Sequence, residues 1–237
     1  NDNSKVTENT ASGKKGSNGN GGGVYVEGGT FEMNGKAKVM KNAVSGANNS
    51  DGHGGGVYVE GGKFDMNGEE TSVSNNTASD NGGGVYSRGT FTMNSSTASV
   101  TDNTADQGGG VYASSGTFTM SGGHITGNHN NGVFVHENAT FTVSGAPTVT
   151  GNTMRGAAGN VFLAGYQRTI TIGKAGLNGS PESIGVTIPY PNENSVIATG
   201  ANGDYNGIFF IDDKRYVVKR EGDKLVLKKE ETPTPDH

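Results

Sequence analysis

The chain has 237 residues, enough for one large domain, yet only 30% are hydrophobic and glycine occupies 42 positions. The net charge of −5, without a basic cluster, argues against a nucleic-acid partner, and the absence of cysteine excludes disulfides and thiolate metal sites. No apolar run approaches the roughly 20 residues that span a bilayer, so we expect no membrane insertion.

One stretch recurs along the chain, and its first full copy reads GGGVYVEGGTFEMNGKAKVMKN at residues 21–42. Residues 4–11, SKVTENTA, match the end of such a copy. Later copies begin at residues 54, 82 and 108, followed by degenerate copies from 131 and 159. A fixed period of this kind indicates a repeat architecture rather than disorder, despite the low apolar content.

The spacing within a copy predicts β-strands. Phe31 and Met33 stand two residues apart with a polar residue between them, and later copies keep this spacing. Period two indicates a strand with one buried face, and each copy holds about three such strands between Gly, Asn and Ser turns. Stacked copies would pair in register at ~4.8 Å. We therefore predict an all-β, right-handed parallel β-helix of about six coils over residues 4–173.

An asparagine occupies the same position in every copy, three residues after a valine or isoleucine that also recurs in every copy. Stacked amides can hydrogen-bond along the axis and satisfy buried polar groups, whereas exposed turn asparagines are the simpler alternative. The exact recurrence favours the ladder. Its members are Asn9, Asn42, Asn76, Asn103, Asn128 and Asn152.

The repeat dissolves from Lys174 onward. Residues 184–200 hold strand-like pieces broken by prolines, and residues 208–229 read as strands whose last two form a hairpin at Glu221-Gly222-Asp223. An open β-helix end needs covering, so we assign residues 174–230 as a C-terminal β cap. Residues 231–237, ETPTPDH, read as a Pro/Thr linker, which suggests a monomeric module within a longer, multidomain chain.

The repeats GGGVY, GTFTMNG and VTDNTA, with the tail GVTIPY and KLVLKK, resemble pectate-lyase-like β-helix repeats of bacterial secreted and cell-surface proteins. The resemblance covers roughly residues 4–230 and implies an extracellular location. It is specific for fold and weak for function, because related β-helices include polysaccharide lyases and hydrolases, adhesins and non-catalytic carbohydrate-binding modules.

A catalytic set is hard to assemble from this sequence. The Gly52-His53-Gly54 stretch looks like the Gly-His-Gly of polygalacturonases, but the paired aspartates and the Arg-x-Lys clamp of those enzymes are missing. Arginine is scarce, and none lies beside a carboxylate cluster as a pectate lyase would require. We expect the chain not to be an enzyme.

Two surfaces could bind a partner. If Val24 and Val26 face inward, Tyr25 faces outward and the tyrosines form an exposed aromatic ladder. A glycan could bind along this ladder, because the spacing between coils is close to the length of one sugar unit. The opposite orientation, with tyrosine in the core, stays open. The ladder would comprise Tyr25, Tyr58, Tyr86 and Tyr112. Three aspartates precede successive glycine runs and either hold calcium between coils or are solvated turn residues; they are Asp51, Asp80 and Asp106.

The charge of the first coils limits the class of polysaccharide that could bind. Glu27 and Glu60, with Glu32 and Asp65, make the first two full coils acidic. This charge would repel polygalacturonate unless calcium bridged the two, but it would not repel a neutral hemicellulose such as xylan. The leading hypothesis is therefore a non-catalytic polysaccharide-binding module of a larger secreted or surface protein. The alternative is a bacterial surface adhesin or stalk segment, in which the repeats supply length and a protein-binding face.

Overall fold

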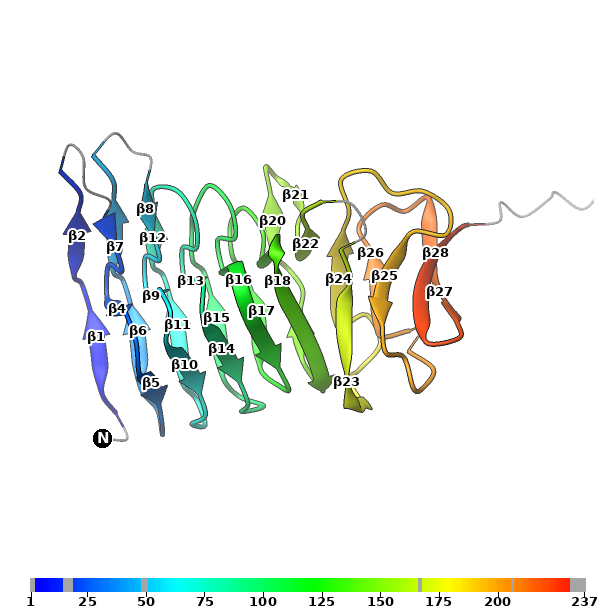
Figure 1. Ribbon diagram of the computed structural model, residues 1–237, viewed down its shortest axis with the longest axis horizontal. Coiled ribbons are helices and arrows are strands. Elements are labelled where there is room, and N and C mark those ends of the chain that lie inside the picture. The colour runs from blue at the N-terminus through cyan, green and yellow to red at the C-terminus, as the bar shows by residue number, and fades with distance from the viewer. Residues whose placement is uncertain (1–2, 15–18, 48–50, 166–167, 206, 231–237) are drawn as a thin grey trace, which may run out of the picture.

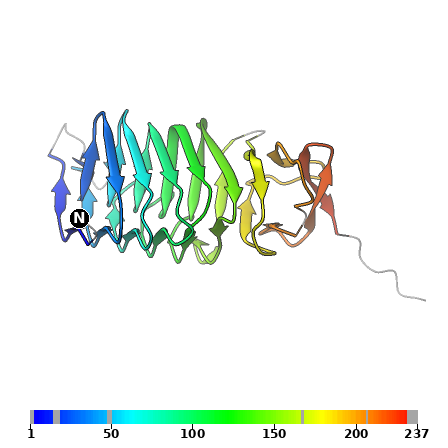
Figure 2. The same cartoon turned by 90° about the horizontal axis from the view of Figure 1, so that it is seen from below.

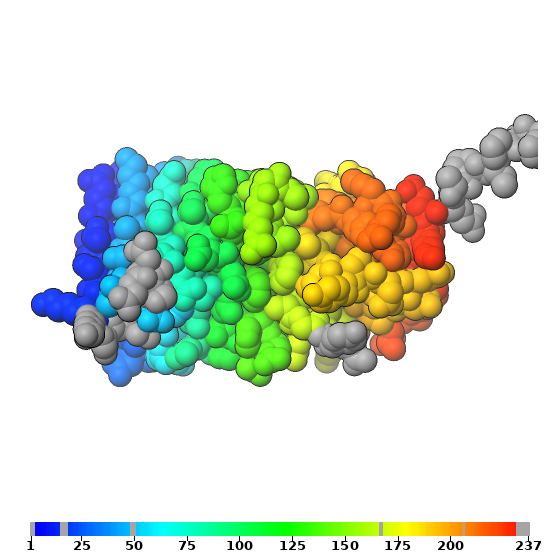
Figure 3. Space-filling model, turned by 90° about the horizontal axis from the view of Figure 1, so that it is seen from above, coloured from blue at the N-terminus to red at the C-terminus, as the bar shows by residue number. Residues whose placement is uncertain are grey.

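The computed structural model describes residues 3–14, 19–47, 51–165, 168–205 and 207–230, and in these ranges the secondary structure is entirely β. The strands stack side by side along one long axis, and the chain advances steadily along that axis from the N-terminal to the C-terminal end (Figures 1 and 2). Successive coils therefore occupy successive slabs of the molecule (Figure 3). The fold is the predicted parallel β-helix. The described part contains no helix that could cross a membrane.

The first column of strands carries the Val-Tyr pairs. Each strand pairs in parallel with its equivalent in the next coil, for example Val57 with Val85 and Tyr58 with Tyr86. The members are β4 (Val24–Val26), β9 (Val57–Val59), β13 (Val85–Ser87), the start of β16 (Val111–Met120), the start of β18 (Val133–Gly145), β22 (Val161–Leu163), β24 (Ile184–Thr187) and β26 (Phe209–Ile211).

The second column carries the Phe-x-Met pattern, and here Phe64 pairs with Phe91 and Met66 with Met93. It consists of β5 (Thr30–Met33), β10 (Lys63–Met66), β14 (Thr90–Met93), the ends of β16 and β18, β23 (Ile170–Leu177) and β25 (Val196–Thr199). The third column carries the valine before the asparagine. It consists of β1 (Lys5–Thr7), β6 (Lys38–Met40), β11 (Ser72–Ser74), β15 (Ser99–Thr101), β17 (His124–Thr126) and β19 (Thr148–Val149).

Short strands complete several of the coils. They are β2 (Thr10–Ser12), β7 (Ala43–Ser45) and β12 (Thr77–Ala78) in one small sheet, β3 (Gly19–Asn20) with β8 (Gly52–His53), and the antiparallel pair β20 (Thr153–Met154) and β21 (Ala157–Ala158). The parallel pairing between coils fixes the position of each strand residue along the long axis, so equivalent residues of successive coils lie directly above one another.

The core is a set of such columns. Phe64, Phe91 and Phe118 are almost completely buried, and their rings stack with centroids 4.9 and 4.7 Å apart. The alternating residues Glu32 and Thr92 point away from the core, as the period-two pattern predicts. Stacked aromatic rings at the strand spacing add to the stabilisation from burial alone. A chain with few apolar residues can therefore build a continuous apolar core, because most of them lie in it.

The asparagine ladder is confirmed. The Nδ2 of Asn76 donates to Oδ1 of Asn103 at 3.0 Å, and its backbone N–H donates to the same oxygen at 2.9 Å. Asn76 Nδ2 also donates to the carbonyl of Val39 in the preceding coil. Every buried ladder asparagine repeats this arrangement, so both amide groups are satisfied without water. The buried members are Asn42, Asn76, Asn103, Asn128 and Asn152.

The ladder continues further than the sequence suggested and ends on a carboxylate. Asn152 donates to Oδ1 of Asn160, and Asn160 donates to Oδ1 of Asp212 at 3.3 Å. Thr187 Oγ1 donates to the other oxygen of Asp212 at 2.5 Å. The bonds from one ladder side chain to the next all run toward the C-terminal end. An aspartate suits the last position because an ionised carboxylate only accepts hydrogen bonds.

The C-terminal boundary differs from the expectation. Coil stacking does not stop at residue 173, because β24 pairs in parallel with β22 and β26 pairs in parallel with β24. The cap proper is the hairpin of β27 (Tyr216–Glu221) and β28 (Lys224–Lys229), which lies antiparallel against β25. The predicted hairpin is confirmed, with Gly222 at positive φ in its turn. The predicted linker, 231–237, lies outside the described residues.

A glycine before each Val-Tyr strand is required by space as well as by backbone conformation. Gly82 has a φ of +69°, and a β-carbon there would lie 2.7 Å from both the Val85 carbonyl oxygen and the Tyr86 β-carbon. We expect Gly82→Ala to lower the free energy of unfolding by about 1–3 kcal/mol, measured by urea denaturation. Gly28 faces open space, so Gly28→Ala is the matched control and should change stability by less than about 0.5 kcal/mol. Equal effects of the two substitutions would contradict this account.

Candidate functional site

The tyrosine column lies outside the coil, as one of the two predicted orientations requires. Val57 and Val59 belong to the main core, whereas Tyr58 belongs to a separate cluster. Ser87 and Ala113 replace the inward valine in the next two coils; both are buried, Ser87 pairs with Val59, and Ala113 pairs with Ser87. The outer cluster contains Tyr58, Tyr86, Tyr112 and Phe134, with Phe162 and Ala164 packed against it.

The expectation that this column is exposed to solvent is wrong for most of its length. Tyr58 is 2% exposed and Tyr112 8%, whereas Tyr25, at the N-terminal end of the stack, is 48% exposed. The rings stack almost in parallel, with centroids 4.8–5.2 Å apart, so each ring covers the face of its neighbour. His53 packs over Tyr86 at 4.7 Å and closes the column further. A glycan therefore has no continuous aromatic track here.

Glu60 has a structural partner on each side. Tyr58 donates its hydroxyl to Glu60 Oε2 at 2.5 Å, and Arg88 Nη1 donates to Glu60 Oε1 at 2.9 Å. The hydrogen bond from Tyr58 holds the pKa of Glu60 below its ordinary value. Burial, and then the bond to Glu60, raises the pKa of Tyr58. Burial likewise raises the pKa of Tyr112, to about 12. These phenols stay protonated at neutral pH and act as hydrogen-bond donors and packing groups.

The acidic surface of the first full coils is smaller than expected. Asp65 is 2% exposed, forms an ion pair with Lys63 at 2.8 Å and accepts a hydrogen bond from Thr92. Glu27 is exposed, so it keeps the position that the sequence predicted for it. A partner would therefore meet the carboxylate of Glu27 but not that of Asp65.

The three aspartates before the glycine runs do lie along one edge. Asp80 is in the middle: its Oδ2 accepts the Asp51 N–H at 3.4 Å, and its carbonyl accepts the Asp106 N–H at 2.7 Å. No three His, Asp or Glu side chains of the described residues converge closely enough to hold a metal ion. The calcium hypothesis for this edge stays a prediction.

His53 gives the edge a pH dependence. Burial lowers the pKa of His53 below its ordinary value of 6.5, opposed by Asp80 and Asp51 and assisted by Arg88. Just below that value the unfolded chain binds more protons at this site than the folded chain does, so stability rises with pH there. We expect the free energy of unfolding to fall between about pH 7.5 and pH 5.5, and to fall less in His53→Gln. Urea denaturation at both pH values tests this; identical pH dependence in the two proteins would contradict it.

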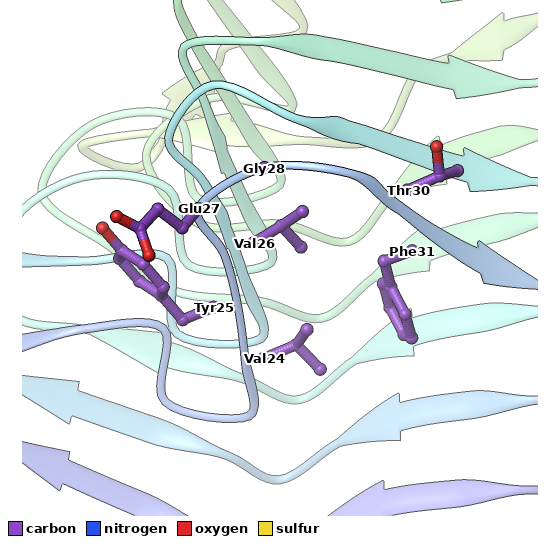
Figure 4. Close-up of a pocket in the computed structure, with 7 residues that line it drawn as sticks. All are labelled: Val24, Tyr25, Val26, Glu27, Gly28, Thr30 and Phe31. Carbon is purple, nitrogen blue, oxygen red and sulfur yellow. The ribbon is translucent and has the colours of Figure 1, made fainter.

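A hollow of about 590 Å³ opens at the N-terminal end of the coil stack. Tyr25 and Glu27 lie next to each other on one side of it, and Val24, Val26 and Phe31 line the rest (Figure 4). Among the described strands, β4 pairs only with β9 and β5 only with β10. Of the predicted ligand-binding residues, Tyr25 and Glu27 thus lie together at an accessible place. The others contact one another through ring stacking and the Tyr58–Glu60 hydrogen bond; they are Tyr58, Tyr86, Tyr112 and Glu60.

A second hollow, of about 660 Å³, was not predicted. It lies near the C-terminal end and is lined by residues from the turns before β23 and β25 and from the cap, among them Arg168, Tyr190 and Lys224. One feature of the sequence could have indicated it: the turn that carries Pro189 and Pro191 is longer than its counterparts in earlier coils.

Residues 70–88 match the repeat of the Chlamydia polymorphic membrane protein family. The matched stretch runs from the turn before β11 to the end of β13 and contains Asn76 of the ladder, the glycine run and Tyr86. No curated protein and no solved structure matched the chain.

This match bears on the expectations at a coarse level. The matched repeat is of a non-enzymatic, surface-protein kind, which agrees with the expectation that the domain is not an enzyme. It also agrees with a location at the cell surface. The finer expectation of a pectate-lyase-like, carbohydrate-binding module receives no support from it.

Proposed function

We propose that this domain is a non-enzymatic stalk or adhesin segment of a cell-surface protein, in which the coils supply length and protein-facing surface. The observation that carries the proposal is the closed tyrosine column. A surface that binds a polysaccharide would expose its aromatic rings to the ligand. Here the rings of Tyr58 and Tyr86 are buried and pack against each other between neighbouring coils. The short match to a surface-protein repeat supports the same function.

The construction of the stack suits a spacer. The ladder of buried amides and the phenylalanine column repeat the same contacts from coil to coil, so stability comes from nearest-neighbour interfaces and not from one central site. Most outward strand positions carry short polar side chains such as Thr92 and Thr119. A surface of this kind keeps an extended repeat protein soluble without specifying a small ligand.

Binding of a neutral polysaccharide such as xylan is the second candidate, and one observation favours it. Tyr25 is 48% exposed and stands beside the exposed Glu27 at the N-terminal hollow, an aromatic ring next to a hydrogen-bond acceptor. A sugar ring could stack on the tyrosine there.

Two measurements distinguish these candidates. Affinity electrophoresis through gels containing xylan, pectin, β-glucan or mannan, with calcium and with chelator, should show no retardation by the neutral polymers if the domain is a stalk or adhesin segment. An antibody raised against the domain should label intact, unpermeabilised cells that carry the parent protein. Retardation by xylan that is lost in Tyr25→Ala would establish the second candidate, and absence of labelling on intact cells would overturn the surface location.

A further inference from the structure

Several glycines of this chain directly follow an asparagine, and such pairs can react with water. The backbone nitrogen of the glycine attacks the side-chain carbonyl carbon of the asparagine, because both groups belong to one short stretch of chain and glycine has no β-carbon to hinder the approach. The reaction requires that the glycine N–H and the asparagine side chain are not held by other hydrogen bonds. The pairs within the described ranges are Asn20-Gly21, Asn34-Gly35, Asn67-Gly68, Asn81-Gly82, Asn131-Gly132, Asn178-Gly179 and Asn202-Gly203.

The stacking of coils protects most of these pairs through the glycine N–H. Gly82 donates its N–H to the carbonyl of Gln107 at 3.0 Å, and Gly68 donates its N–H to the carbonyl of Met33 at 3.1 Å. Such a nitrogen cannot lose its proton and turn toward its own asparagine without breaking a bond between coils. The N–H groups of two other glycines are held in the same way: Gly21 and Gly132.

Two further pairs are restrained in other ways. Asn202 donates its amide to the Lys174 carbonyl at 3.1 Å and accepts the hydroxyl of Tyr205, so its side chain is held on both sides. None of the described residues bonds to the amide of Asn34, but its carbonyl accepts the Ala37 N–H at 3.3 Å and closes a turn. A closed turn fixes the backbone angle about which the glycine nitrogen must rotate to reach the side chain.

Asn178-Gly179 has none of these restraints. The pair lies in the turn between β23 and β24, Asn178 is exposed, and no described residue hydrogen-bonds to its side-chain amide or to the Gly179 N–H. The Asn178 N–H donates to the Gly145 carbonyl at 2.8 Å, so the backbone is anchored just before the reactive groups. A β-carbon on Gly179 would meet Ser183 Oγ at 3.0 Å and its next neighbour only at 3.8 Å, so there is room for the nitrogen to move.

We propose that Asn178 deamidates spontaneously and is a modification site of this protein. The Gly179 nitrogen forms a bond to Cγ of Asn178 and gives up its proton, while the bond between Cγ and Nδ2 breaks and ammonia leaves. The product is a five-membered succinimide ring. Water then adds to one of the two ring carbonyls and reopens the ring: attack at Cγ gives aspartate, and attack at the main-chain carbonyl of residue 178 gives isoaspartate. Water is the only co-reactant.

The modification changes the charge and the backbone of this turn. Either product carries a carboxylate that is ionised at neutral pH, so one negative charge is added. Isoaspartate also inserts one extra carbon into the main chain between β23 and β24. Because the reaction is spontaneous and not reversed by water, the converted fraction increases with the age of the molecule. The modification does not depend on the proposed function of the domain.

Peptide mapping by mass spectrometry tests the proposal on the full chain, incubated in mildly alkaline buffer prepared with heavy-oxygen water. The peptide with Asn178 should convert first, to a mixture of aspartate and isoaspartate that contains the heavy oxygen. Gly179→Ala should slow this conversion by about tenfold, which corresponds to about 1.4 kcal/mol in the activation barrier, because the added β-carbon hinders the nitrogen. Gly179 does not have a positive φ, so alanine fits its backbone.

The pairs Asn67-Gly68 and Asn81-Gly82 are matched controls within the same molecule, because only their hydrogen bonds distinguish them from Asn178-Gly179. Both should stay unchanged while Asn178 converts, and in concentrated urea all three should convert at similar rates. Conversion of either control as fast as Asn178 in the folded chain, or an unchanged rate in Gly179→Ala, would overturn the proposal. The same ranking of the three pairs in urea and in buffer would also overturn it, because the selection would then come from neighbouring residues and not from the fold.

Discussion

Replacing Asn103 with alanine is expected to lower the free energy of unfolding by about 4 kcal/mol, because several buried groups lose their partners together. Oδ1 of Asn103 accepts the backbone N–H and the Nδ2 of Asn76 at 2.9 and 3.0 Å. Its Nδ2 donates to the Val73 carbonyl and to Oδ1 of Asn128, both at 3.0 Å. Asn103 is 0% exposed, so water cannot replace these bonds without opening the coil.

Asn94 provides the comparison. It also donates its amide to an equivalent asparagine one coil away, Asn67, at 2.8 Å, but this pair is exposed. Asn94→Ala should therefore change stability by less than about 0.5 kcal/mol. Urea denaturation of both variants, followed by circular dichroism, measures the difference. If the two substitutions destabilise equally, burial of the ladder is not the source of its contribution.

Replacing Phe91 with alanine is expected to lower the free energy of unfolding by about 3–5 kcal/mol. Phe91 is 0% exposed and lies between Phe64 and Phe118, with ring centroids 4.9 and 4.7 Å away. Its removal leaves a cavity in the middle of the stack, and parallel strand pairing above and below holds the neighbouring rings at their heights, so the space cannot close.

Phe31 is the matched control because it occupies the same column at the N-terminal end. It stacks on one ring, Phe64, at 5.2 Å and is only half-buried. Phe31→Ala should therefore cost less than half of what Phe91→Ala costs, measured by the same denaturation. Similar losses would mean that the column stabilises the fold by local strand contacts and not by continuous stacking.

The fold was predictable because every copy of the repeat has the same pattern of buried and exposed positions. Each copy alternates apolar and polar residues at the same positions, as at Phe64, Asp65 and Met66, so one register satisfies all coils. The ladder could be predicted for the same reason. Its extension to Asn160 and Asp212 could not, because these residues stand outside the period and are brought to the ladder only by the shape of the last coils.

The site was less accessible to sequence reasoning. The alternation left two orientations of the tyrosine column open, and the structure has the one with Tyr58 outside the coil. The direction of a side chain, however, does not determine its exposure. Exposure depends on neighbours in other coils, here the stacked Tyr86 and the overlying His53, and only the stacked assembly supplies these. The hollow with Arg168, Tyr190 and Lys224 joins three segments distant in sequence, and no local pattern places them together.

The strands run across the long axis, and their hydrogen bonds run along it (Figure 1). A pull on the two ends therefore loads these bonds along their length and can open them one coil at a time, starting from an end. The ladder asparagines Asn76 and Asn103 are 27 residues apart, so each opened coil would release about 90 Å of chain, at ~3.4 Å per residue. Under tension such a segment would lengthen in steps, and each step would lower the force that the segment transmits.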